Sequence, residues 1–227
     1  MPSFQLKNRC DAGSRLALKI PYCDVVIAIP RGGIPIAEPI CIQHQVPLLL
    51  TYHRKLGAPK NPEFAFGAVS EYGDVILNQQ VIESLGITEK YIHQTIEGEL
   101  QEIKKRKQRY PCKALSIEDK VIVIVDDGIA TGLTMLSAIA AIKSQNPKEL
   151  IVAVPVASNH AAETIGQQAS WVCLHQTDQF GAIGEFYQDF KQVETPEAVA
   201  ILNKVNQSRQ QKWIRAREDS NLQPPGS

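Results

Sequence analysis

The fold is decided by residues 121–134, which read VIVIVDDGIATGLT. Residues 121–125 are five β-branched residues in a row, a pattern that favours a strand buried on both faces. Asp126 and Asp127 follow that strand, and a helix is predicted over 132–144. A strand that passes through a short glycine-containing turn into a helix is the repeating unit of an α/β fold.

The same alternation continues on both sides of this stretch. Strands are predicted at 25–29, 47–52, 150–156 and 171–174, and helices at 34–45, 88–109, 160–168 and 196–209. Thr88 is the predicted N-cap of its helix. Pro39 is expected to end or kink the helix over 34–45. The sequence therefore predicts an α/β fold with a mainly parallel sheet.

Residues 53–80 have a different character. A basic loop rich in chain-breaking residues is predicted for 53–63, followed by a short hairpin formed by 64–69 and 74–77. A long exposed segment inside a compact domain is often a lid. At the other end, residues 211–227 are polar and contain Pro-Pro-Gly, so they predict a disordered tail outside a domain that spans 1–210.

The overall composition argues against several classes of partner. The 24 basic and 24 acidic residues give a formal net charge of +0, which leaves no electrostatic footprint for nucleic acid or an anionic membrane. No apolar run is long enough to span a membrane, and the first residues lack the apolar core of a signal peptide. Five cysteines without a CxxC pair favour reduced thiols. A cytoplasmic protein is expected.

The turn after the strand combines features of a phosphate site and a sugar site. Its two glycines let the backbone approach a ligand, and successive amides at a helix start suit an anion. Two carboxylates would repel a phosphate, so Asp126 and Asp127 are expected to accept hydrogen bonds from vicinal ribose hydroxyls. A Mg²⁺ ion would relieve the crowding of negative charge. The alternative is a generic strand–turn–helix in which an Asp caps the helix.

The stretch also resembles the phosphoribosyl-pyrophosphate signature of type I phosphoribosyltransferases. That signature is a hydrophobic run, two acidic residues, a few small or apolar residues and then Thr-Gly, and every element is present in order. The resemblance implies a twisted parallel sheet flanked by helices, with a flexible lid at about 53–80 and a small hood from about 1–20 and 175–195. It implies that Asp126 and Asp127 hold the ribose hydroxyls and, directly or through those hydroxyls or water, the metal. The 5′-phosphate would be held by Gly128, Ile129, Ala130, Thr131, Gly132 and Thr134.

A second family feature, the pyrophosphate loop, has a counterpart at residues 30–33, PRGG. Arg31 offers a planar fork for phosphate oxygens, and Gly32 and Gly33 expose backbone amides. The resemblance also implies a non-proline cis peptide here, with the Arg31–Gly32 bond as the candidate. Without the neighbouring signature, PRGG would be interpreted as a simple turn.

The lid is the third family feature, and it contains Arg54, Lys55 and Lys60. Lys55 is the first candidate for a pyrophosphate contact and Lys60 the second. Solvated loop charges are the alternative interpretation. Closure of a lid would exclude water, which competes with the acceptor as a nucleophile.

Residues 11–13, 55–63 and 180–190 extend the resemblance to a subgroup of bacterial phosphoribosyltransferases with poorly defined substrates. Ala130 stands where enzymes acting on 6-oxopurines usually carry an Asp, which disfavours hypoxanthine and guanine as acceptors. Several aromatic residues either stack on a flat acceptor base or form the core of the hood: Phe4, Phe180, Phe186, Tyr187 and Phe190.

The activity that the resemblance implies is Mg²⁺-dependent transfer of the phosphoribosyl group from phosphoribosyl pyrophosphate to a nitrogenous base or similar acceptor, by a homodimer. Catalytic roles fall to Asp126, Asp127, Arg31 and Lys55. One alternative is a non-catalytic regulator that binds phosphoribosyl pyrophosphate, but the basic residues at 104–109 are interpreted as a solvated helix end. The other is a phosphosugar hydrolase, for which the sequence has no nucleophile motif.

Overall fold

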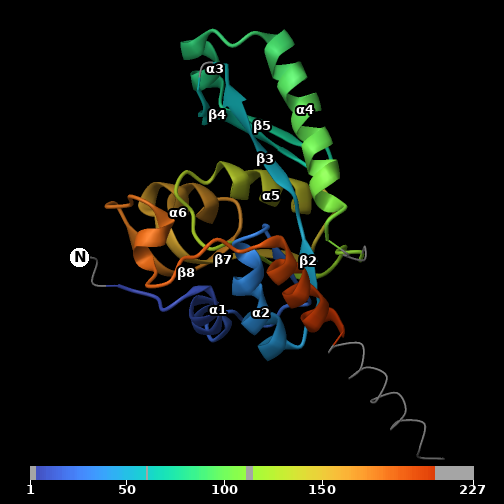
Figure 1. Ribbon diagram of the computed structural model, residues 1–227, viewed down its shortest axis with the longest axis vertical. Helices are drawn as coiled ribbons and strands as arrows, with labels where there is room; N and C mark the ends of the chain where they lie inside the picture. The colour runs from blue at the N-terminus through green and yellow to red at the C-terminus, as the bar shows by residue number, and fades with distance from the viewer. Residues whose placement is uncertain (1–3, 60, 111–114, 208–227) are drawn as a thin grey trace, which may run out of the picture.

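The computed structural model describes residues 4–59, 61–110 and 115–207, and its centre is a five-stranded parallel sheet (Figure 1). The strand order is β2-β1-β6-β7-β8. The strands are β1 (Val25–Ala28), β2 (Leu48–Leu50), β6 (Val121–Val125), β7 (Glu149–Ser158) and β8 (Ser170–Thr177). The predicted parallel sheet is confirmed. β6 is its central strand, between β1 and β7, and the motif at 126–134 follows directly after it.

Alternate residues of the central strands belong to two separate cores. Val26 and Val123 pack with α1 (Arg9–Ala17) and α2 (Gly33–His44) on one face of the sheet. Ile27 and Ile124 pack with α5 (Leu133–Lys143) and α6 (Asn159–Gly166) on the other. The helical residues 195–207 join the first core. Because both faces are covered, β1 and β6 carry no polar side chain.

The helix α2 continues through Pro39 to His44, so the expectation that the helix ends at this proline is wrong. Both Ile36 and Ile40 are fully buried on this helix. Their burial, at roughly 25 cal/mol per Å² of apolar surface, outweighs the one backbone hydrogen bond that a proline removes. The predicted N-cap of α4 (Glu89–Lys107) is confirmed, because the Thr88 side chain accepts a hydrogen bond from Tyr91 N.

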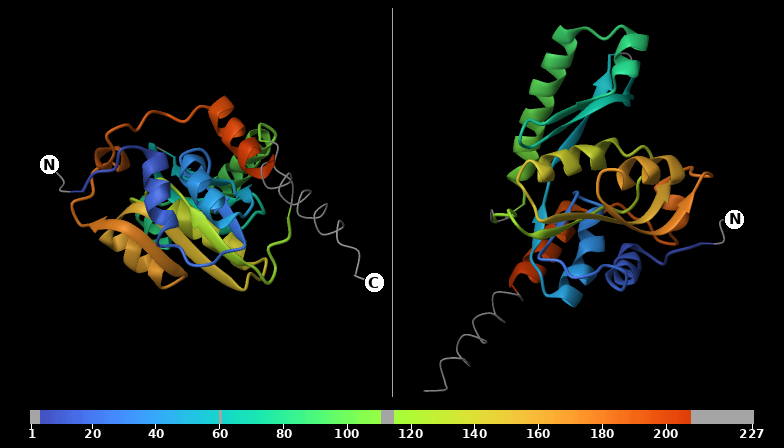
Figure 2. Two further views of the ribbon diagram at one scale, coloured as in Figure 1. Left: turned by 90° about the horizontal axis from the view of Figure 1, so that it is seen from below. Right: turned by 180° about the vertical axis from the view of Figure 1, so that it is seen from behind.

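Residues 53–107 form an upper lobe above one end of the sheet (Figure 2). Its antiparallel sheet is β3 (His53–Ala58), β4 (Asn61–Ser70) and β5 (Val75–Leu77), and its helices are α3 (Gln79–Leu85) and α4. The predicted hairpin is confirmed as β4 and β5. The predicted loop over 53–63 is wrong, because β3 pairs with β4 and buries Leu56. Register shifts on either side of Gly57 accommodate the chain-breaking residues.

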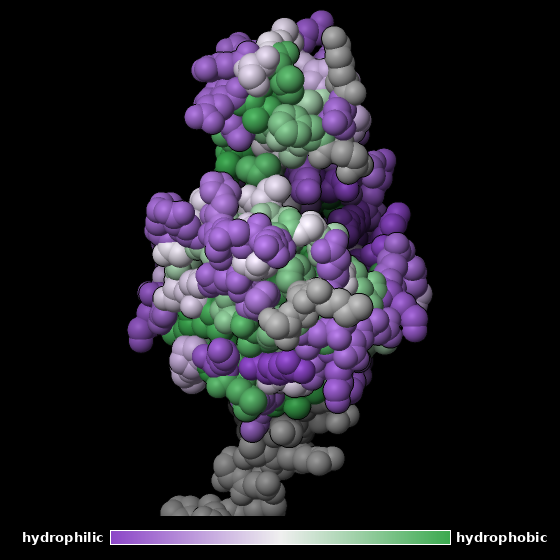
Figure 3. Space-filling model, turned by 90° about the vertical axis from the view of Figure 1, so that its left-hand side faces the viewer, coloured by the Kyte–Doolittle hydropathy of each residue, from purple (hydrophilic) through white to green (hydrophobic). Residues whose placement is uncertain are grey.

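The beginning and the end of the domain lie side by side on the body. Leu6 N donates a hydrogen bond to Phe186 O at 2.9 Å, and Gln188 N donates to Leu6 O at 2.8 Å. A short 3₁₀ helix, η1 (Ile183–Phe186), precedes this contact. Figure 3 shows the upper lobe as a narrower region on top of the body, with hydrophilic side chains gathered on one side of the junction. Within the described ranges, no helix is both long and apolar enough to cross a membrane.

Candidate functional site

The two loops singled out in the sequence, 30–33 and 126–134, meet at the carboxyl end of the sheet. A Cβ added to Gly33 would lie 2.6 Å from Val125 O, and one added to Gly32 would lie 2.1 Å from Asp127 Oδ2. Both distances are far below van der Waals contact, so only glycine lets the loops approach this closely. The cis peptide of this turn is Pro30–Arg31, one bond earlier than predicted.

Asp127 is paired with an arginine from the first helix. Arg9 Nε and Arg9 Nη2 each lie 2.8 Å from Asp127 Oδ2, and the Arg9 side chain is 11% exposed. Burial raises the pKa of Asp127, and the charge of Arg9 acts in the opposite direction. Asp127 therefore holds the start of the chain against the motif, a role that its place in the sequence did not predict.

The C-terminal part of the domain completes the surroundings of this ion pair. Tyr187 donates its hydroxyl hydrogen bond to Asp127 O at 2.6 Å. The Arg9 guanidinium lies 3.8 Å above the Phe190 ring and donates to Lys191 O at 2.7 Å. Among the hood aromatics, Phe186 and Tyr187 are buried in the core, and Phe4 stacks on His175. These contacts are internal to the protein, as the core interpretation of the hood expects.

Asp126 lines a cavity of about 540 Å³ between the body and the upper lobe. Its Oδ1 accepts a hydrogen bond from Asp127 N at 2.9 Å. Burial and the neighbouring carboxylate of Asp127 raise the pKa of Asp126 well above its ordinary value. Thr134 and Lys55 line the same cavity, so the structure brings together an acid and a hydroxyl of the 126–134 motif with a cation of the predicted lid.

The loop after Asp127 is held open by β7. Ile129 N donates to Val156 O at 2.9 Å, and Ser158 Oγ donates to Ala130 O at 2.7 Å. Gly132 adopts φ +82°, a conformation that favours glycine, and it begins α5 without a side-chain cap from the described residues. The first amides of this 11-residue helix are therefore suited to an anionic ligand.

His53 also lines this cavity, although no motif indicates it. It is buried, and its ring nitrogens lie 2.7 Å from Thr51 Oγ1 and 2.9 Å from Ser137 Oγ. Burial lowers the pKa of His53 to about 4, so the ring is neutral at pH 7. It links the first residue of β3 to α5, the helix that follows the phosphate-type loop.

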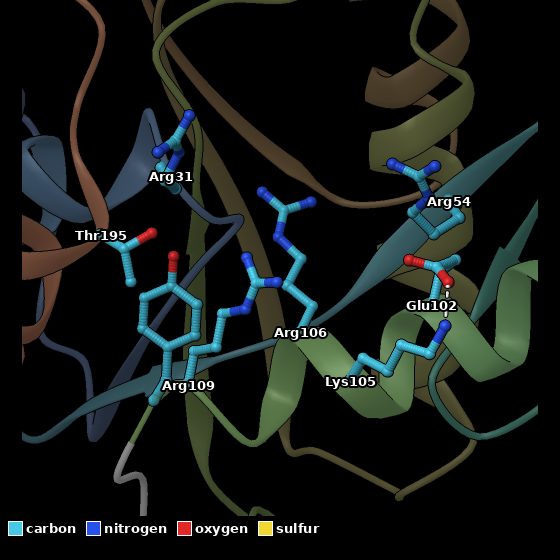
Figure 4. Close-up of a pocket in the computed structure, with 8 residues that line it drawn as sticks. Arg31, Arg54, Glu102, Lys105, Arg106, Arg109 and Thr195 are labelled. Atoms are coloured by element: carbon cyan, nitrogen blue, oxygen red, sulfur yellow. Dashed lines mark hydrogen bonds and ion pairs between the residues drawn. The ribbon is translucent and has the colours of Figure 1, made fainter.

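The remaining predicted cations occupy different places. Arg31 lies 3.5 Å from the exposed Glu194 and lines a second cavity of about 350 Å³, beside the first (Figure 4). Arg106 and Arg109 line that second cavity too; Arg106 is half-buried, whereas Arg109 is exposed, as the interpretation of residues 104–109 as a solvated helix end expects. Lys60 lies outside the described residues.

The donor set fits Mg²⁺ only in combination with a ligand. The described part of the chain contains no cluster of three or more His, Cys, Asp or Glu residues that could hold a metal alone. Magnesium in phosphate sites is commonly bound by one or two carboxylates together with substrate phosphates. Asp126 faces the cavity, whereas Asp127 is held by Arg9, so Asp126 is the carboxylate that fits this pattern.

A family model described as phosphoribosyl transferase domain matches residues 6–191, which is most of the chain. The chain belongs to this family. The resemblance seen in the sequence is thereby confirmed, and the matched residues include both loops of the site described above.

Relatives of this phosphoribosyl transferase domain occur in bacteria. Two Mycobacterium tuberculosis proteins, from strains CDC 1551 / Oshkosh and H37Rv, are provisionally named phosphoribosyl transferases; each is 32% identical over 206 residues. The match covers 88% of this chain but 46% of each relative, so the chain spans less than half of their length. The crystal structure of TT1426 from Thermus thermophilus is 32% identical, with a TM-score of 0.75, and the match covers 88% of this chain and 98% of that one.

Proposed function

We propose that this protein transfers the phosphoribosyl group of Mg²⁺-bound phosphoribosyl pyrophosphate to a nitrogenous base or similar acceptor. The observation that carries the proposal is the meeting of Asp126, the uncapped start of α5 and the PRGG turn around one set of cavities. Asp126 suits a ribose, the start of α5 suits a monophosphate and the PRGG turn suits a pyrophosphate. These are the three parts of this donor.

Each part of the donor has its own residues. The 5′-phosphate binds at the amides of Gly128 and 130–134, since the Ile129 amide already donates to Val156 O, and the hydroxyls of Thr131 and Thr134 add donors. The ribose hydroxyls donate to Asp126, and Asp127 contributes through its free carboxylate oxygen while Arg9 holds the other. The pyrophosphate binds at Arg31, the amides of the PRGG turn and Lys55.

The transfer is a substitution at the anomeric carbon of the ribose. The bond from that carbon to pyrophosphate breaks, and its electron pair leaves with the pyrophosphate oxygen. An acceptor nitrogen forms the new bond and releases its proton. Bound Mg²⁺ would neutralise part of the negative charge of the leaving pyrophosphate. The chain contributes mainly position and electrostatics, through Asp126 at the ribose and Arg31 and Lys55 at the leaving group.

The first test is calorimetric titration with phosphoribosyl pyrophosphate, with and without Mg²⁺. We expect binding that requires Mg²⁺ and is lost in Asp126→Ala, while Asp178→Ala, at an exposed acid, retains it. Asp126→Ala is cleaner than any change at Asp127, since removing Asp127 would leave Arg9 buried without its partner. No binding by the unmodified protein at millimolar ligand would overturn the proposal.

A positive titration leads to a panel of bases assayed for pyrophosphate release. Release with at least one base, abolished by Asp126→Ala, is the expected result. Donor binding without release from any base would instead indicate a regulatory protein that senses the donor.

A further inference from the structure

The second cavity, of about 350 Å³, is lined by cations from separate parts of the chain. Arg31 comes from the PRGG turn, Arg54 from β3, Arg106 from α4 and Arg109 from the residues just after α4. Arg54 and Arg106 also line the 540 Å³ cavity that contains Asp126, here called the donor cavity, so the two cavities are adjacent. A ligand bound at Asp126 therefore lies next to the second cavity.

Most carboxylates near this cavity are already paired. Arg54 pairs with Glu99, and Lys105 pairs with Glu102, the one acid among the described lining residues. Within the described ranges, neither Arg106 nor Arg109 has a carboxylate at ion-pair distance. The cavity therefore carries an uncompensated positive charge.

The uncompensated charges lie next to each other. Arg109 N donates to Arg106 O at 3.1 Å, which places the two residues one turn apart, and Figure 4 shows their side chains together between Arg31 and Arg54. Arg106 Nη2 also donates to Pro30 O at 3.0 Å, so this guanidinium is fixed against the PRGG turn. Neighbouring guanidinium groups repel each other because both are positively charged, and an anion bound between them offsets that repulsion.

We propose that Arg106 and Arg109 bind the outer phosphate of a pyrophosphate group, as substrate-binding residues outside every motif of the sequence. The inference rests on the proposed function, because it places the inner phosphate at the PRGG turn. Pyrophosphate is the anion that fits: it bridges from the donor cavity, and its two phosphates reach two adjacent sets of guanidinium groups. Since α4 belongs to the upper lobe and PRGG to the body, one ligand then joins the two lobes.

The test compares two ligands on the full chain by calorimetry: Mg²⁺-pyrophosphate and ribose 5-phosphate. Arg109→Met is the principal variant, because Arg109 is exposed and its side chain forms no ion pair with any described residue. Arg106→Met is the second variant, and Lys104→Met, exposed on the same helix but outside both cavities, is the matched control. We expect each arginine variant to weaken pyrophosphate binding about tenfold or more. Ribose 5-phosphate binding should stay within about twofold in all variants.

Equal pyrophosphate affinity in Arg109→Met and Lys104→Met would overturn the inference, as would an unmodified protein that does not bind pyrophosphate. Ribose 5-phosphate separates this failure from failure of the proposed function. If the unmodified protein binds ribose 5-phosphate but not pyrophosphate, the donor pocket stands and this subsite falls. If it binds neither, both fall.

Discussion

Asp126 and Asp127 are neighbours in the sequence with different surroundings in the structure. Asp126 faces the donor cavity, whereas one oxygen of Asp127 is occupied by Arg9. A carboxylate held by one hydrogen bond and one ion-pair contact, both at 2.8 Å, keeps a fixed orientation. In the proposed function this orientation positions its remaining oxygen for a ribose hydroxyl. The pair thus combines one acid that is free to bind with one that is anchored.

The buried His53 predicts a pH dependence of stability. Its pKa is about 4 when folded and about 6.5 when unfolded, so the unfolded chain binds more protons between these values. The free energy of unfolding should therefore fall as pH drops from 7 to 5, by about 2 kcal/mol from this group alone. Urea denaturation at pH 7 and pH 5 should show a smaller fall for His53→Asn. The exposed His160→Asn serves as control and should keep the full fall.

Sequence reasoning found the parts of the site that are contiguous along the chain. A local pattern of glycines and charges at the end of a strand indicates Asp126, the loop after it and the PRGG turn. Arg9 and His53 could not be found this way. Arg9 meets Asp127 across 118 residues, and His53 meets Ser137 across 84. Such contacts depend on how helices pack, which a single sequence does not encode locally.

At the scale of elements, α1 and α2 pack so closely that a glycine is required between them. A Cβ on Gly13 would lie 2.3 Å from Ile36 O and 2.6 Å from Pro39 Cγ. We expect Gly13→Ala to lower the free energy of unfolding by about 1–3 kcal/mol, because backbone must move to relieve the overlap. Denaturant unfolding of purified variants measures this.

Gly98 is the matched control for that substitution, because it lies inside α4 with nothing among the described residues within 4 Å of an added Cβ. Gly98→Ala should raise the free energy of unfolding by about 0.5–1 kcal/mol. A Gly13→Ala protein as stable as Gly98→Ala would contradict the packing described here.

The elements themselves were largely predictable because most carry a strong local sequence pattern. The sequences of β1, β6 and β7 are apolar on both faces of the strand, and Thr88 is a typical N-cap residue at the start of α4. β3 was missed because its glycine and charges resemble a loop, and the burial of Leu56 against β4 is visible only once the strands pair. Local propensity was overridden by tertiary packing there, as it was at Pro39.

At the scale of the whole molecule, the donor cavity lies between two lobes that are joined through the chain at Thr51–Tyr52 and after α4. A ligand that contacts both lobes should restrict motion of the upper one. We expect Mg²⁺-phosphoribosyl pyrophosphate to slow amide hydrogen exchange in β3–β5, while β8, an edge strand of the parallel sheet, exchanges as before. Slowed exchange confined to 128–134 would contradict a lid role for 53–80.

The contact of Arg9 and Tyr187 with the same aspartate has a consequence for how the protein is made. Chains emerge from the ribosome N-terminus first, at about 5–20 residues per second. Arg9 emerges early, but Tyr187 and Phe190 follow only when nearly all of the domain has been synthesised. Until then Asp127 lacks its hydroxyl donor and Arg9 lacks the aromatic ring that covers it. A released chain that is truncated before residue 187 should therefore contain all strands of the parallel sheet and still be unable to assemble the proposed ribose site.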